Sequence, residues 1–182
     1  MKILGHFLRI YVPSSAKRKK LQELCRLTAE AFLRDAPEMS GLSHSEALAR
    51  YASFTRDSSV EVIESGQDLD ALKKRLFQNA CILGERLRRK FRPRNLKDVM
   101  IISRVLYRTL GIDFQGNREG EAVIRSCFFS SYYSGQICRI ISSLDEGLAA
   151  GLSGGGRLSF EQRMTEGKDC CLARLCLEEN EE

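Results

Sequence analysis

Three cysteines and one aspartate in the last third of the chain have side-chain types that covalent or metal chemistry uses. Cys127 ends a β-branched and aromatic segment, and Cys171 opens the last expected strand. Cys138 and Asp145 lie in the helix expected between them. If these element ends converge, two or three thiolates with a carboxylate suit zinc, and a single activated thiolate can act as a nucleophile. Free cysteines are also common as small buried apolar side chains, so three interpretations stay open.

Asp145 is a candidate because of its expected place in the helix over 134–150. It follows Leu144 and lies four residues after Ile141, and both of these residues are expected to face the core. A carboxylate near a helix C-terminus is unfavourable with respect to the helix dipole. We therefore expect Asp145 either to face solvent or to handle protons at a site.

A further polar group is expected on the strand that follows Gly154–Gly156. Alternation with Phe160 places Glu161 and Arg163 on the opposite face of that strand. There they form either an exposed group or the lining of a cleft in which Arg163 holds an anionic ligand. Tyr133, which precedes the helix, is expected to supply an aromatic wall and a phenol donor, or to pack in the core.

The elements that position these residues follow from the spacing of apolar side chains. After a short apolar arm over 1–13, helical spacing predicts a series of helices up to residue 111. They span 15–35, the segment after a capping box at Ser43–Glu46, the segment from Asp68 to before Pro93, and the segment from Asn95 to a stop at Gly111.

The pattern changes after residue 112. We expect a loop over 113–120, a strand over 121–129, the helix over 134–150 and a flexible turn over 151–156. Strands over 157–164 and 170–178 then form an antiparallel hairpin. This order predicts an α+β fold in one domain over 1–182, with an N-terminal helical layer packed on a small antiparallel sheet with a C-terminal hairpin. Residues 1–112 form mainly the helical layer, and 113–178 are expected to carry the site.

Length, charge and cysteine usage limit the classes of function. The chain has 182 residues and a net charge of +5, and its basic runs at 17–20 and 86–94 are interpreted as solvated helix faces, so no nucleic-acid partner is expected. Seven cysteines, an odd number, without a recognisable secretion signal favour a reducing compartment, so we expect a cytoplasmic protein. No apolar run reaches membrane-spanning length, so no membrane partner is expected.

The pattern of these C-terminal residues resembles that of the L-2-amino-thiazoline-4-carboxylic acid hydrolase-like family. The resemblance covers residues 15–177, and its motifs are Cys127, Cys138, Asp145-Glu146-Gly147, Arg163–Gly167 and Cys171. It implies an enzyme that opens a small sulfur–nitrogen heterocycle with water. The positions that carry over are Cys127, Cys138, Asp145, Gly167 and Cys171.

The chain also resembles the 4-vinyl reductase-type domain, a relative of the fold of trafficking (TRAPP) subunits. This resemblance rests on Leu83–Leu87, the helix that ends at Leu110-Gly111, and the final hairpin. It implies a small-molecule-binding domain, in some members with a zinc ion held by cysteines and a glutamate. The zinc ligands it implies here are Cys138, Glu161 and Cys171, with Met164 in place of the middle cysteine.

Three functions follow as hypotheses. The first is hydrolysis of a C–N bond in a small cyclic amidine or thiazoline carboxylate. In this hypothesis Cys127 or Cys138 is the nucleophile or a metal ligand, and Asp145 or Glu161 handles protons, while Arg163 holds the substrate carboxylate. The second is a non-catalytic module that binds or senses a small molecule. The third is an assembly protein that forms a homodimer through its helical layer.

Overall fold

The computed structural model describes residues 14–177 and shows a four-stranded antiparallel sheet with helices packed against it. The helices are α2 (Ser14–Ala31), α3 (His44–Glu64), α4 (Leu69–Phe91), α5 (Leu96–Thr109) and α6 (Gly135–Ser153). The strands are β1 (Ile112–Gly116), β2 (Glu121–Cys127), β3 (Arg157–Gln162) and β4 (Cys171–Cys176), in the spatial order β1-β2-β4-β3. Short 3-10 turns, η1 (Phe128–Ser131) and η2 (Met164–Glu166), precede α6 and β4.

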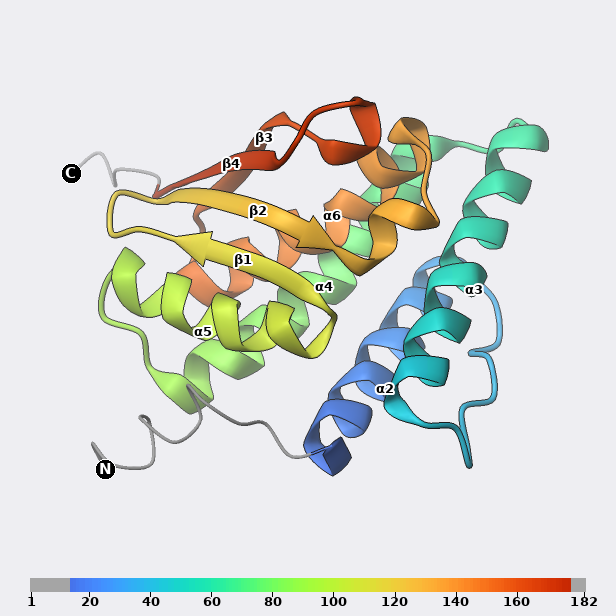
Figure 1. Cartoon of the computed structure of the whole chain (residues 1–182), viewed down its shortest axis with the longest axis horizontal. Coiled ribbons are helices and arrows are strands. Elements are labelled where there is room, and N and C mark those ends of the chain that lie inside the picture. The colour runs from blue at the N-terminus through green and yellow to red at the C-terminus, as the bar shows by residue number, and fades with distance from the viewer. Residues whose placement is uncertain (1–13, 178–182) are drawn as a thin grey trace.

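The arrangement in space places the helices behind and beside the sheet. In Figure 1, α4 and α6 lie behind the strands, α5 runs alongside β1, and α2 and α3 stand as a pair at one end. The expected α+β fold and its C-terminal hairpin, β3 with β4, are confirmed. The expected apolar arm over 1–13 lies outside the described residues. None of the helices described is long and apolar enough to cross a bilayer.

The helix starts form where the sequence places capping residues. The Ser43 hydroxyl accepts a hydrogen bond from the Glu46 backbone N–H at 3.3 Å, and the Glu46 carboxylate accepts one from the Ser43 N–H at 2.7 Å. Asp68 and Asn95 cap α4 and α5 in the same way, through free N–H groups of the first turn. These side chains accept hydrogen bonds from backbone N–H groups that would otherwise have no partner. Ser134 caps α6 in the same way, so all four helices from α3 to α6 begin at or next to a residue of this type.

The segment after Gly111 is a strand, so the prediction of a loop over 113–120 is wrong for its first part. Ile112 and Phe114 alternate with polar residues, and Phe114 is buried against the helices while β1 pairs with β2. Only residues 117–120 form the turn. The Asn117 side-chain oxygen accepts hydrogen bonds from the N–H groups of Glu119 and Glu121, which closes this turn tightly.

The end of α6 also differs from the prediction, because Gly151 belongs to the helix rather than to a flexible turn. The helix continues to Ser153, and Gly154 ends it in a left-handed conformation with φ of 88°. Gly147 and Gly151 face α4 so closely that a Cβ atom on either would overlap the backbone carbonyl oxygen of Phe77 or Cys81. Glycine therefore lets the two helix backbones touch along the length of the contact.

Candidate functional site

The described residues line a largely apolar, partly open cavity between the helices and the sheet. Its volume is about 110 Å³, and each of the helices α2 to α6 contributes to its wall, together with β1, β2, β4 and both 3-10 turns. Most wall positions are aliphatic or aromatic, for example Leu83, Ile141, Leu148 and Phe129. The helical layer, residues 14–112 of the described part, thus supplies much of the cavity wall beside the residues from 113–178.

Five residues predicted for the site line this cavity. They are Cys127, Tyr133, Cys138, Asp145 and Cys171. The pairing of β2 with β4 places Cys171 opposite Ile124, three residues before Cys127. The helix α6 carries Cys138 and Asp145, and Tyr133 lies two residues before it. Element ends that are far apart in sequence therefore converge, as the spacing of these residues suggested.

Glu161 and Arg163 do not line the cavity. Glu161 is exposed on β3. A register shift in β3 between Phe160 and Gln162 breaks the alternation on which the prediction relied. As a result the Arg163 guanidinium lies over the Phe160 ring, 4.5 Å from its centre, and not on the opposite face. The Arg163 Nε atom is buried without a hydrogen-bond partner, as is the hydroxyl of Thr165 on the cavity wall.

Asp145 lies just past the middle of α6, about two turns before its end, and not at the C-terminus as predicted. The Tyr107 hydroxyl donates a hydrogen bond to the Asp145 carboxylate at 2.7 Å. Tyr107 is itself held by stacking on Phe114, with 4.9 Å between ring centres. Burial raises the pKa of Asp145 to about 6, an effect that the Tyr107 hydrogen bond and the Arg163 charge oppose and that Glu146 reinforces. The pKa of the Asp145 carboxyl group therefore lies closer to neutral pH than that of an exposed aspartate.

Two cysteines of the wall, Cys127 and Cys171, lie in surroundings that disfavour the charged thiolate. Burial raises the pKa of Cys127 to about 12, and burial also raises the pKa of Cys171. The Cys171 sulfur accepts a hydrogen bond from the Met164 backbone N–H at 3.3 Å. Within residues 14–177, no three His, Cys, Asp or Glu side chains lie close enough to hold a metal ion. The set Cys138, Glu161 and Cys171 is thus not assembled as a zinc site.

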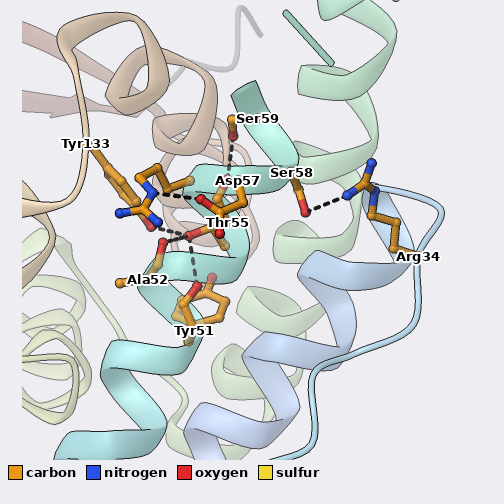
Figure 2. A network of polar contacts seen from close by, with 9 residues as sticks. Arg34, Tyr51, Ala52, Thr55, Asp57, Ser58, Ser59 and Tyr133 are labelled. Carbon is orange, nitrogen blue, oxygen red and sulfur yellow. Dashed lines mark hydrogen bonds and ion pairs between the residues drawn. The ribbon is translucent and has the colours of Figure 1, made fainter. Parts of the chain in front are cut away.

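Tyr51 and Tyr133 line the cavity, and their hydroxyl groups form hydrogen bonds with two threonines that do not line it. The single hydroxyl proton of Thr28 goes to the Leu24 carbonyl, so the Tyr51 hydroxyl must donate to Thr28, at 3.0 Å. The Thr55 hydroxyl likewise gives its single proton to backbone carbonyl groups of α3. The Tyr133 hydroxyl therefore donates the hydrogen bond that joins it to Thr55. Figure 2 shows Tyr133 meeting Thr55 within a polar network along α3. Thr28 and Thr55 are fully buried. The two contacts link α2 to α3, and α3 to the segment that leads into α6.

Sequence reasoning missed Tyr107, which is the hydrogen-bond partner of Asp145. Helical spacing of the apolar residues between Asn95 and Gly111 predicts an inward face made of Val99, Ile102, Val105, Leu106 and Leu110, without Tyr107. The buried residues are instead Val99, Met100, Ser103, Tyr107 and Thr109. Val99, Ser103 and Tyr107 recur every four residues, and that spacing is the signal that places the tyrosine on the buried face.

Comparison with known proteins assigns no family to the chain. No protein-family model matches it, and neither a curated protein nor a solved structure matches it significantly. The two family resemblances therefore stay predictions. The function has to be inferred from the cavity and from the residues of its wall.

Proposed function

We propose that the protein binds a small, largely apolar molecule in the cavity around Asp145. The observation that carries this proposal is the cavity of about 110 Å³ with its mostly apolar wall. A single water needs only about 10–15 Å³ by a comparable measure, and water is poorly held where few polar partners face it. Ligand pockets in proteins commonly combine such apolar walls with a few well-placed polar groups. Asp145 and Tyr107 are such groups here.

The chemistry of the wall favours binding over nucleophilic catalysis by Cys127. A thiol with a pKa of about 12 is almost entirely protonated near neutral pH, whereas the thiolate is the reactive form. Arg163, expected to hold a substrate carboxylate, is absent from the cavity wall. A largely apolar ligand matches such a wall better than a small carboxylated heterocycle does.

The binding proposal is tested with toluene as a probe of the cavity. At a hundred times its Kd, a probe that binds only the folded state adds about 2.7 kcal/mol to the free energy of unfolding, which raises the Tm. Cys138→Leu extends a side chain from the cavity wall, so we expect this variant to lose the Tm shift. Cys176→Leu is the matched control, because Cys176 is exposed at the end of β4, and it should keep the shift.

Differential scanning calorimetry with and without toluene gives both results. If toluene fails to raise the Tm of the unmodified protein, the cavity does not accept apolar molecules. If Cys138→Leu keeps the whole shift while it folds normally, the probe binds elsewhere.

A second candidate function, hydrolysis of a small cyclic amidine, is favoured by the pKa of Asp145. A carboxylate with a pKa of about 6 is suited to general base catalysis near neutral pH. In this reaction Asp145 takes a proton from water as the water oxygen bonds to the amidine carbon. The C=N π electrons move to the nitrogen, which takes this proton from Asp145. Asp145 then accepts the proton of the new hydroxyl group as the C=O bond forms and the C–N bond breaks, and it passes that proton to the leaving nitrogen. Cys127 has no role in this version, in contrast to the prediction from the sequence.

Steady-state turnover of 2-amino-thiazoline-4-carboxylate tests this second candidate. We expect Asp145→Asn to lower kcat about a hundredfold, since a positioned general base contributes at least about that factor. Cys127→Ala should stay close to the unmodified protein. Absence of turnover in the unmodified protein, or full activity of Asp145→Asn, would contradict the hydrolase function and leave the binding proposal intact.

A further inference from the structure

The Asp145 carboxylate has unused capacity to accept hydrogen bonds inside the cavity. A carboxylate offers about four acceptor positions, whereas the Tyr107 hydroxyl is the sole hydrogen-bond donor to it within residues 14–177. A buried carboxylate that is not fully paired costs free energy, and the accessible part of Asp145 lines the cavity. A ligand in the cavity is therefore in a position to supply the missing donor.

The described part of the protein supplies no cation for this carboxylate. Lys20 lines the cavity, but its ammonium group is bound to Glu23 at 2.7 Å. Arg163 acts on Asp145 through its charge without forming an ion pair, and its guanidinium stacks on Phe160. Within residues 14–177, therefore, no cation pairs directly with Asp145, and a ligand with a positive charge would find the carboxylate open to it.

The aromatic part of the wall suits a cation as well as an apolar body. Tyr51, Phe129 and Tyr133 pack in sequence, with ring centres 5.9 Å and 5.5 Å apart. The hydroxyl groups of the two tyrosines are engaged outside the cavity, with Thr28 and Thr55. The rings therefore contribute carbon surface to the cavity, and ring faces attract ammonium and amidinium groups. An anionic ligand would instead be repelled by Asp145.

We propose that the ligand is a small apolar molecule with a basic nitrogen, a hydrophobic amine or amidine whose protonated nitrogen donates hydrogen bonds to Asp145. This inference rests on the binding function proposed above, because it names the class of molecule that the cavity takes. The apolar part of the molecule lies against aliphatic side chains such as Leu83 and Leu148. The cation completes the pairing of the carboxylate, so charge and hydrogen bonds are both satisfied.

The test uses toluene, benzyl alcohol, benzylamine and benzoate, which share one ring and differ in the polar group. Isothermal titration calorimetry at pH 7.5 measures the Kd of each compound. We expect benzylamine to bind at least about tenfold more tightly than benzyl alcohol, since a charge-assisted hydrogen bond is stronger than a neutral one. Asp145→Asn should remove this preference. Asp169→Asn is the matched control, because Asp169 is an exposed carboxylate before β4, and it should keep the preference.

The outcomes separate the ligand class from the binding function. If toluene binds but benzyl alcohol or benzoate binds as tightly as benzylamine, the inference of a basic nitrogen is overturned and the binding function stands. If the preference for benzylamine persists in a folded Asp145→Asn protein, as judged by circular dichroism, Asp145 is not its partner and the inference again fails. If none of the four compounds binds, the binding function and the inference are both overturned.

Discussion

Gly151→Ala is expected to destabilise the protein by about 3 kcal/mol or more, at the upper end of what overpacking of a core costs. The new Cβ atom would overlap the backbone carbonyl oxygen of Cys81 on α4, and its neighbours there are also backbone atoms. A backbone atom cannot move aside as the end of a side chain can, so the two helices must separate. Urea unfolding followed by circular dichroism at 25 °C measures the loss.

Gly135→Ala is the matched control in the same helix. A Cβ atom there would lie 3.2 Å from the Cγ atom of the Glu166 side chain and 3.3 Å from the Thr165 carbonyl oxygen, whereas a Cβ atom at Gly151 would overlap the Cys81 carbonyl oxygen. The better helix propensity of alanine, worth up to about 1 kcal/mol, offsets the small adjustment, so we expect stability close to that of the unmodified protein. Equal unfolding curves for Gly151→Ala and Gly135→Ala would show that α4 and α6 are not in backbone contact.

Asp145→Asn is expected to stabilise the protein at pH 7.5, by up to about 3 kcal/mol. Burial raises the pKa of Asp145 from 3.8 to about 6, and each pKa unit corresponds to about 1.4 kcal/mol. The Asp145 contribution to stability is fully present below about pH 3.8 and is lost as the pH rises through about 6, because ionisation is harder in the folded state. Asparagine does not ionise, and its side-chain oxygen can still accept the hydrogen bond from Tyr107.

Urea unfolding at pH 4 and at pH 7.5 measures this prediction. The stabilisation by Asp145→Asn should be present at pH 7.5 and nearly absent at pH 4. The exposed Asp169 gives the comparison, since Asp169→Asn should change the free energy of unfolding by less than about 0.5 kcal/mol at either pH. A destabilised Asp145→Asn protein at pH 7.5 would mean that the carboxylate is better solvated or paired than the cavity geometry indicates.

The local signals in the sequence predicted most of the fold. Ser43, Asp68, Asn95 and Ser134 cap the helices at the expected places, because capping depends on hydrogen bonds within one turn. Gly151 was assigned to a turn because glycine disfavours helices in isolation. Its actual place depends on contact with α4, about 70 residues earlier in the chain, and local propensity carries no information on that contact.

The candidate site could be predicted only in part. The convergence of Cys127, Cys138, Asp145 and Cys171 was anticipated from their places at the ends of elements or in the helix between them. Tyr107 was missed because its role depends on how α5 faces α6, which the apolar residues of α5 alone do not decide. Arg163 was misplaced because one register shift in β3 reverses the alternation of faces.

The phenol groups of Tyr51 and Tyr133 have a consequence for the cavity before any ligand enters. Protein interiors tend to close empty space, and an aromatic ring that can rotate is well able to fill it. Here the hydroxyl groups of the two tyrosines form hydrogen bonds with Thr28 and Thr55, which do not line the cavity, and these bonds restrict the rotation of the rings. Phenylalanine at these positions would have the same ring surface but would lack the hydroxyl group that forms this hydrogen bond. The tyrosines thus keep the cavity from being filled by their own rings, so a molecule of the proposed kind would enter a preformed site and lose little free energy to rearranging its walls.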